Sequence, residues 1–201
     1  MKKNTKKFLK VVAVVAVVNW LFKKPANAMD QEENNFNFAG SGNRPNFAAE
    51  LTPENIKENF RKIYRIYGRE KTKRLEQMYR NETAHFKSGQ FKTSFSPGME
   101  SVPNNAPSYF PFGWSSLKQF AEKYNIPASS FYQGPTLTEG GTGKPKRFVG
   151  FPTLLSAMMF VMFVIEKRGW NFGKWYSFNE NLAQGYLNHL DKIRTPFVDS
   201  F

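Results

Sequence analysis

The stretch from Pro152 to Lys167 constrains the fold more than any other part of the chain. It is apolar at nearly every position from Leu154 to Ile165. A helix of this length is too short to cross comfortably a hydrocarbon core about 30 Å thick. A helix that is apolar on all sides must then be buried by other parts of the same protein. The sequence therefore predicts a globular domain built around one central helix.

The first 28 residues differ from the rest in charge and in hydrophobicity. They carry seven lysines and no acidic residue, so they hold +7 of the net charge of +13. An apolar run, residues 8–22, follows the basic start, and Ala26, Asn27 and Ala28 resemble a cleavage site. Two interpretations remain: a signal peptide, or a short membrane anchor through residues 8–22 if the segment is not cleaved. As a helix the run spans roughly 22 Å, which favours export over anchoring.

Composition excludes several classes of site. The chain has no cysteine, which rules out disulfides, thiolate metal sites and a cysteine nucleophile. It has two histidines, His85 and His189, which argues against an all-histidine metal site. We therefore expect no metal and no cofactor. Residues 29–201 hold 22 basic and 16 acidic residues, and this moderate excess does not by itself predict nucleic-acid binding.

A polar segment separates the N-terminus from the predicted domain. Residues 29–51 are rich in Asn and Gly and lack a hydrophobic period, which predicts a flexible tether. The domain, residues 52–201, begins with Thr52-Pro53-Glu54, a sequence typical of a helix start. Gly68 is expected to end this first helix. A second helix is expected to run from Arg69 to about Phe86.

The remaining elements follow from changes in period. Residues 87–113 lose the helical pattern and predict a small hairpin or an irregular β region. A short helix is expected between Ser115 and Pro127, and residues 133–150 are expected to form a Gly- and Pro-rich loop. Ser177 and Glu180 match a capping box for the last helix. The apolar face of that last helix is expected to carry Leu182, Tyr186, Leu190 and Ile193.

Glu82 is the strongest candidate for chemistry. It lies seven residues after Leu75, so at about 100° per residue it shares the apolar face of the second helix. A carboxylate on such a face is costly unless it is paired or protonated. A protonated carboxyl at neutral pH is what a general acid requires. The alternative is a structural glutamate bonded to a neighbouring Arg or Tyr, and both interpretations stay open here.

Three segments carry a resemblance to a known family. Glu82-Thr83-Ala84-His85-Phe86 is similar to a catalytic Glu-Ser-x-x-Phe segment, and Gly113-Trp114-Ser115-Ser116-Leu117 lies where that family has Gly-Leu-Met-Gln-Leu. Trp170-Asn171-Phe172-Gly173, with Tyr186 downstream, lies where the family has Tyr-Asn-Ala-Gly and a later aromatic residue. Over roughly residues 52–195 the chain thus resembles the lysozyme-like superfamily. Within it, the chain resembles the soluble lytic transglycosylases and related phage muramidases.

The resemblance implies a mainly α fold of the α+β kind, a lysozyme-like helical domain with a small β region. It also implies cleavage of peptidoglycan glycan strands at the β-1,4 bond between N-acetylmuramic acid and N-acetylglucosamine, with Glu82 as general acid. Glu100 would be the second acid of a hydrolase, or else a surface glutamate in a loop. Without a second acid, Glu82 would act as acid and then as base, giving a 1,6-anhydro product.

The predicted substrate contacts surround these motifs. Ser88 and Gln90 follow Glu82 closely and could bind substrate or Glu82 itself. Aromatic rings in non-helical stretches could stack on sugars, although core packing is the commoner use of a large ring. Together with the asparagine of the third match, the further candidates are Tyr109, Trp114, Asn171, Trp175 and Tyr176.

Two other functions are compatible with the sequence. One is a non-catalytic envelope or virion structural protein with the same fold, and the other is a basic nucleic-acid-binding module. The structural-protein and the enzymatic interpretations both predict an exported protein. It would lie in the periplasm or cell envelope, and could be membrane-anchored or virion-associated.

Overall fold

The described part of the chain is mainly helical, which confirms the predicted fold class at this level. The computed structural model of the chain describes residues 45–98, 101–102, 115–138 and 145–201. Its α-helices are α3 (Phe47–Glu50), α4 (Pro53–Glu82), α5 (Phe91–Ser94), α6 (Ser115–Lys123), α7 (Leu154–Lys167) and α8 (Glu180–Leu190). Short 3₁₀ helices are η1 (Ala128–Ser130), η2 (Phe172–Trp175) and η3 (Val198–Ser200). The strands are β1 (Ser101–Val102), β2 (Tyr132–Thr138) and β3 (Pro145–Gly150).

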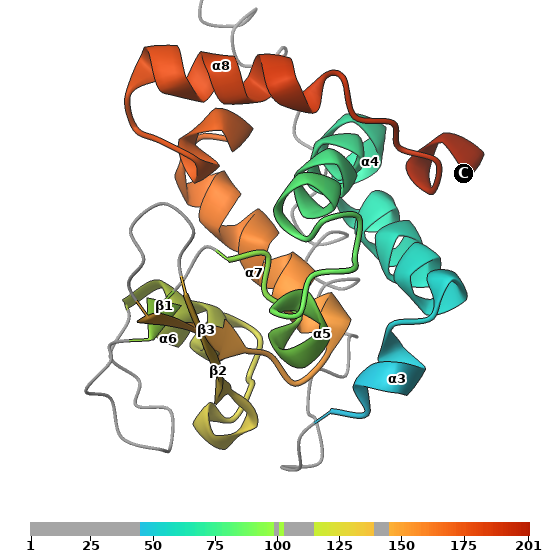
Figure 1. Cartoon of the computed structure of the whole chain (residues 1–201). Coiled ribbons are helices and arrows are strands. Elements are labelled where there is room, and N and C mark those ends of the chain that lie inside the picture. The colour runs from blue at the N-terminus through green and yellow to red at the C-terminus, as the bar shows by residue number, and fades with distance from the viewer. Residues whose placement is uncertain (1–44, 99–100, 103–114, 139–144) are drawn as a thin grey trace, which may run out of the picture. The chain divides into compact units, whose positions relative to one another are not determined.

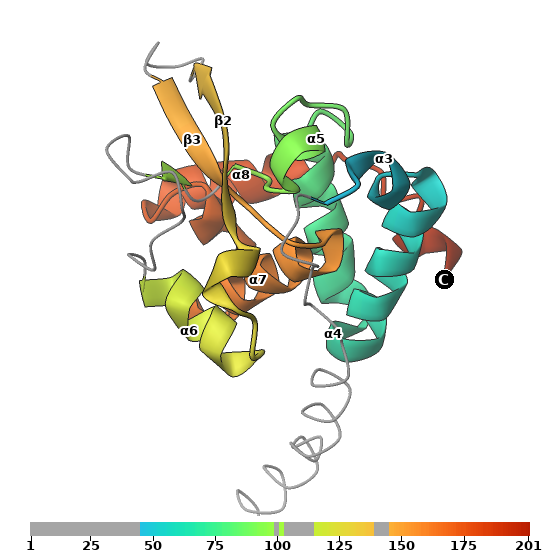
Figure 2. The ribbon, with the colours of Figure 1, turned by 90° about the horizontal axis from the view of Figure 1, so that it is seen from below.

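Helix α7 is the buried central helix that the sequence predicts. Every side chain from Leu154 to Ile165 is buried. Thr153 caps the helix in a reciprocal box with Ser156, whose backbone N–H donates to the Thr153 hydroxyl at 3.1 Å. In both views α7 lies between α4 on one side and α6 with the sheet on the other (Figures 1 and 2). The apolar stretch is therefore covered by protein on all sides.

Helix α4 starts and breaks where the sequence predicts. The Thr52 hydroxyl accepts from the backbone N–H of Asn55 at 3.2 Å, and Pro53 occupies the first turn. Gly68 has φ 77° and ψ 175°, a left-handed conformation that interrupts the helix and splits it in two. The predicted end at Phe86 is wrong, because the helix ends at Glu82.

The sheet lies elsewhere than the sequence predicts. Residues 91–94 form helix α5 instead of part of a hairpin, and within the described residues of the predicted β region β1 is the one strand. The supposed loop of residues 133–150 contains β2 and β3, which pair antiparallel and give the sheet order β1-β3-β2. Gly134 and Gly150 allow close packing in this sheet. A Cβ on Gly134 would lie 2.9 Å from the Phe148 carbonyl oxygen, and one on Gly150 would meet the Tyr132 ring.

The fully buried acid of α4 is Glu76. Its carboxylate binds Arg80 at 2.7 Å and accepts backbone N–H groups from Phe197 at 3.2 Å and Val198 at 2.9 Å. Because these two residues belong to the C-terminal segment, Glu76 fastens that segment, including η3, to α4. Glu76 is thus an Arg-paired glutamate inside the core, six positions before Glu82. Glu82 itself bonds to Tyr186, and a tyrosine is one of the two partners that the structural alternative for Glu82 named.

Helix α8 begins differently from the prediction. Its cap is Asn179, whose side chain accepts from the N–H groups of Asn181 and Leu182. Ser177 instead accepts from the N–H of Asn179 at 3.1 Å, so the predicted Ser177–Glu180 capping box is wrong. Leu182 was expected on the apolar face, but more than half of its side chain is exposed.

The part of the chain before α4 is where the sequence predicts a membrane segment and a tether. Helix α3 occupies the last part of the predicted tether, and its Phe47 ring lies 4.7 Å from the ring of Phe95. The predicted signal or anchor, residues 1–28, lies outside the described residues. Within residues 45–98, 101–102, 115–138 and 145–201, no helix combines the length and apolar character that a membrane crossing needs.

Candidate functional site

Glu82 is the last residue of α4, and its carboxylate is half-buried. The Tyr186 hydroxyl donates to Oε1 of Glu82 at 2.6 Å, and the Asn81 side-chain amide donates to the same oxygen at 3.1 Å. Both contacts therefore use one oxygen of the carboxyl group. Among the described residues, no basic side chain forms an ion pair with Glu82.

The turn after Glu82 is strained and tightly fixed. Residues 84–86 are not glycines, yet they have φ values of 48°, 57° and 68°. Each left-handed residue costs about 1 kcal/mol or more. The Thr83 hydroxyl holds the turn, since it donates to the Tyr79 carbonyl and accepts from the N–H of Phe86 at 2.9 Å. Such strain tends to persist at functional sites, and here it ends α4 so that Glu82 sits at the helix terminus.

Tyr186 is a buried residue of α8 that links Glu82 to an exposed ring. Its ring stacks on Tyr176 with centroids 5.3 Å apart and planes within 3° of parallel. Burial raises the pKa of Tyr186 far above its usual value, and the charge of Glu82 and the hydrogen bond to it raise that pKa further, against a smaller opposing effect of Asn81. Tyr186 therefore stays protonated and can donate to Glu82 at any ordinary pH.

A second polar contact joins α4 and α8. Nε2 of His189 lies 2.9 Å from the side-chain oxygen of Asn81. With its hydrogen on Nε2, His189 donates to that oxygen, and the NH₂ group of Asn81 then faces Glu82, which is the orientation seen. Tyr186 and His189 are three residues apart, so both lie on the face of α8 toward α4.

Close packing of η2 against α8 brings Tyr176 to this site. Asn171 caps η2 by accepting from the N–H of Gly173 at 2.9 Å. A Cβ on Gly173 would lie 2.6 Å from the carbonyl oxygen of Ala183 on α8. Because Gly173 has no Cβ, the two elements approach closely enough for Tyr176 to stack on Tyr186.

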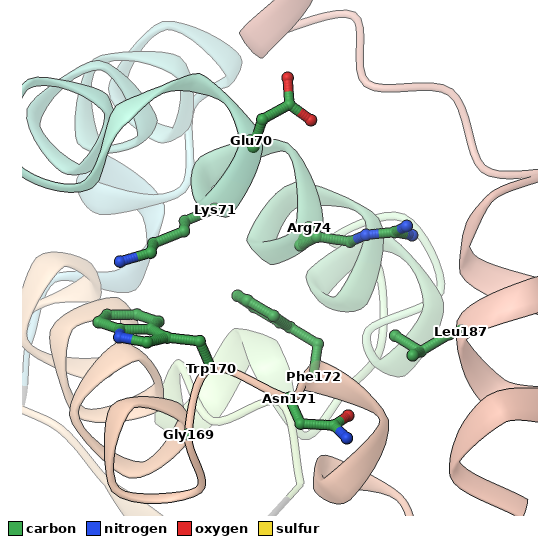
Figure 3. Close-up of a pocket in the computed structure, with 8 residues that line it drawn as sticks. All are labelled: Glu70, Lys71, Arg74, Gly169, Trp170, Asn171, Phe172 and Leu187. Atoms are coloured by element: carbon green, nitrogen blue, oxygen red, sulfur yellow. The ribbon is translucent and has the colours of Figure 1, made fainter. Parts of the chain in front are cut away.

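Asn171 also lines a separate pocket of about 360 Å³. There the ammonium group of Lys71 lies 3.4 Å from the centre of the Trp170 ring, a cation–π contact. Figure 3 shows Lys71 and Arg74 pointing to opposite sides of Phe172, so the two cations do not converge on one point. The pocket is lined by Glu70, Lys71, Arg74, Gly169, Trp170, Asn171, Phe172 and Leu187, without Glu82.

The other predicted substrate-contact residues are spread over α5, η2 and the part of the chain outside the described residues. The Ser88 hydroxyl accepts from the N–H of Phe91 at 3.2 Å, and Gln90 donates to the Ser96 carbonyl at 3.0 Å. Both side chains thus bind the backbone around α5. Trp175 is half-buried at the end of η2, and Tyr176, the next residue, is exposed beside Tyr186. The candidates outside the described residues are Glu100, Tyr109 and Trp114.

Sequence reasoning missed Asn81, which donates to Glu82, and His189, which contacts Asn81. Asn81 precedes Glu82 directly, and His189 follows Tyr186 by three residues, the spacing of one helical face. This spacing indicates that Tyr186 and His189 share one face of α8, but it does not show that this face packs on α4. Within the described part of the chain, no cluster of three or more His, Asp or Glu side chains is arranged to hold a metal ion.

The site therefore combines a carboxyl group held by one oxygen, a protonated tyrosine and an exposed aromatic ring. Comparisons of the chain with protein-family models, with curated proteins and with solved structures found no match.

Proposed function

We propose that this protein cleaves peptidoglycan glycan strands at the β-1,4 bond between N-acetylmuramic acid and N-acetylglucosamine, as a lytic transglycosylase or a muramidase. Glu82 is the general acid. The observation that carries the proposal is the environment of Glu82, a half-buried residue at a helix end, held by Tyr186, whose ring stacks on the exposed ring of Tyr176. The lysozyme-like resemblance of the sequence supports the same reaction.

The hydrogen bonds of Glu82 indicate which oxygen carries the reacting proton. Tyr186 and Asn81 both donate to Oε1. A protonated carboxyl has its hydrogen on one oxygen only, and the two donors occupy Oε1. Oε2 is therefore the oxygen from which Glu82 would transfer a proton. Tyr186 and Asn81 act as positioning residues, since they orient Glu82 without contacting the substrate themselves.

The reaction then follows from the chemistry of glycosides. Glu82 gives its proton to the glycosidic oxygen, the bond from that oxygen to C1 breaks, and positive charge develops on the sugar. The resulting Glu82 carboxylate takes a proton from the C6 hydroxyl of the muramic acid, which closes a 1,6-anhydro ring. In the hydrolytic alternative water attacks C1, with Glu100 as the second acid that assists.

Digestion of purified sacculi by the full-length protein tests this function. Wild type is compared with Glu82→Gln and with Glu166→Gln, an exposed glutamate at the end of α7 that serves as a matched control. We expect wild type and Glu166→Gln to release soluble muropeptides, and Glu82→Gln to release none above background. Mass spectrometry then separates anhydro ends, made by a transglycosylase, from reducing ends, made by a hydrolase.

One observation favours a second candidate function. Within the described residues, Glu82 is hydrogen-bonded by Tyr186 and Asn81, and neither partner is a carboxylate. A non-catalytic envelope or virion structural protein that binds glycan would need none. In that case folded wild-type protein would bind sacculi and release no products.

The proposed substrate lies outside the cytoplasm. The basic start, the apolar run of residues 8–22 and the small residues near position 28 agree with export to the periplasm or cell envelope, with or without a retained anchor. Both functions need this localisation.

A further inference from the structure

Three large apolar side chains remain exposed near the start of α8. Tyr176 is 63% exposed, Phe178 is 69% exposed and Leu182 is 54% exposed. Among the described residues they are the large hydrophobic side chains that stand out as exposed, and all three lie between positions 176 and 182. Grouped exposed apolar side chains mark a binding surface more often than scattered ones do.

Both rings of this group are held from one side. Tyr176 stacks on Tyr186 at 5.3 Å. Phe178 lies under the guanidinium group of Arg168, 5.0 Å from the ring centre. Each ring therefore has one face in contact and still exposes more than half of its surface. Rings fixed in this way lose little conformational freedom when a ligand binds.

Helix capping does not account for Phe178. It precedes the cap Asn179, where an apolar residue often packs on the residue four positions into the helix, here Ala183. Ala183 is buried, but the exposure of Phe178 shows that a capping contact leaves most of the ring open. The ring is thus available for another partner.

The exposed group is continuous with Glu82. Leu182 and Tyr186 are four residues apart on α8, one turn of about 5.4 Å, and so share one helical face. Tyr176 stacks on Tyr186, and the Tyr186 hydroxyl reaches Glu82 at 2.6 Å. Two contacts through the buried Tyr186 therefore connect the exposed group to the carboxyl group.

We propose that Tyr176, Phe178 and Leu182 form a platform that binds the glycan strand beside the bond that Glu82 cleaves. The C–H faces of pyranose rings would lie on the exposed faces of Tyr176 and Phe178. This inference rests on the proposed function for the identity of the glycan. The platform assigns two residues, Phe178 and Leu182, that no motif of the sequence indicated.

The charges around the platform favour a glycan over an anionic membrane. The ammonium group of Lys174 lies 4.0 Å from the carboxylate of Glu180, so these two charges largely offset each other. Arg168 is engaged, since it covers Phe178 and donates to the Lys174 carbonyl at 2.7 Å. Stable binding to anionic lipid needs several basic side chains in addition to apolar ones.

A sedimentation assay with purified sacculi tests the platform. Every protein carries Glu82→Gln at full length, so that the polymer is not digested. We expect Phe178→Ala and Tyr176→Ala each to weaken binding by roughly threefold to tenfold. We also expect oligomers of β-1,4-linked N-acetylglucosamine to compete with the sacculi for the parent protein.

Phe201→Ala is the matched control. The Phe201 ring also lies under an arginine, with the guanidinium carbon of Arg61 5.1 Å from its centre, and against a ring, that of Tyr64 at 5.6 Å. It ends the chain, beyond the end of α8 opposite the platform (Figure 1). Its removal should leave binding to sacculi unchanged.

Unchanged binding in both platform variants would overturn the inference, and so would a failure of the oligomers to compete. It would also be overturned if the variants lost binding to vesicles of phosphatidylglycerol and phosphatidylcholine while keeping binding to sacculi. The proposed function fails separately. If wild-type Glu82 protein digests sacculi and the platform variants bind normally, only the platform is wrong. If no digestion occurs and the variants lose binding, the protein binds glycan through the platform without cleaving it.

Discussion

At the level of single residues, the proposed glycan cleavage depends on how Glu82 is oriented by its hydrogen bonds. A carboxyl group with both donors on one oxygen keeps a defined orientation while its other oxygen remains available. Positioning of this kind contributes to a rate because the reacting atoms must be aligned before the proton moves. Asn81 and Tyr186 supply that orientation from two different helices, so it depends on how α4 and α8 pack.

Replacing Tyr186 with Phe tests the positioning role. The change removes the hydroxyl but keeps the ring on Tyr176. A hydrogen bond to a charged group is worth roughly 1.5–3 kcal/mol, so we expect kcat on sacculi to fall about tenfold to a hundredfold. KM should change little, since the platform stays in place. A loss in KM alone, with kcat intact, would show that Tyr186 contacts substrate and does not position Glu82.

The raised pKa of Tyr186 predicts a stability change at high pH. Its pKa in the folded protein lies well above the ordinary value of 10.0, chiefly because of burial. Below about pH 10 the folded and unfolded states both keep the proton, and the stability does not vary through this group. Above about pH 10 the unfolded state loses the proton first, so the free energy of unfolding falls as pH rises.

Urea unfolding of wild type and Tyr186→Phe at pH 8 and at pH 11 measures this effect. We expect the decline between the two pH values to be smaller in Tyr186→Phe. Equal declines would mean that Tyr186 titrates alike in the folded and unfolded states.

At the element scale, the sequence predicted helices better than strands. The start of α4 at Thr52 and its break at Gly68 follow from local signals that act within a few residues, and α7 follows from its apolar run. Strands β2 and β3 carry Gly134, Pro135 and Pro145, which are typical of loops in isolation. Their pairing is decided by contacts across the hairpin and with β1, and a local pattern does not contain that information.

The candidate site shows the same limit. Glu82 could be found from its place on a helical face, and Tyr186 from a resemblance of motifs. The hydrogen bond between the two could not be predicted, because they are 104 residues apart in the sequence. The same holds for His189 and Asn81, which are 108 residues apart. Of the proposed platform, Tyr176 was among the predicted contact residues, whereas Leu182 was not, because it fits the apolar period of α8 although its side chain is exposed.

The contact between η2 and α8 gives a prediction at this scale. A Cβ at Gly173 would lie 2.6 Å from the Ala183 carbonyl oxygen and 3.0 Å from the Ala183 Cβ. Gly173→Ala should force the two elements apart and lower the free energy of unfolding by roughly 1–3 kcal/mol. It should also lower activity, because Tyr176 would shift on Tyr186.

Gly185→Ala is the control for this prediction. Gly185 lies within α8, and a Cβ there meets nothing within 4 Å. Alanine favours the helix by up to about 1 kcal/mol relative to glycine, so thermal unfolding should show a rise in stability. If both glycine variants behave alike, the close approach of η2 to α8 does not limit the fold.

At the scale of the whole molecule, Glu76 fastens the C-terminal segment to α4. It is fully buried and binds Arg80 together with the N–H groups of Phe197 and Val198. Removing one partner of a buried ion pair leaves the other without compensation, which costs about 3–5 kcal/mol. We expect that loss of unfolding free energy for Glu76→Gln, measured by urea denaturation.

Glu58→Gln is the matched change at the surface. Glu58 pairs with Arg61 at 2.6 Å, but both side chains are about two-fifths exposed. Exposed pairs are worth at most about 1 kcal/mol. A comparable loss in the two variants would mean that Glu76 does not hold the C-terminal segment in place.

The most direct test of the whole account is the rate at which full-length protein solubilises purified sacculi, for wild type and for Glu82→Gln. General acid–base catalysis typically contributes a factor of about 10² to 10⁴. The account predicts a loss of at least about a hundredfold in Glu82→Gln, with binding to sacculi and the far-ultraviolet circular dichroism spectrum unchanged. Equal rates in the two proteins would contradict it.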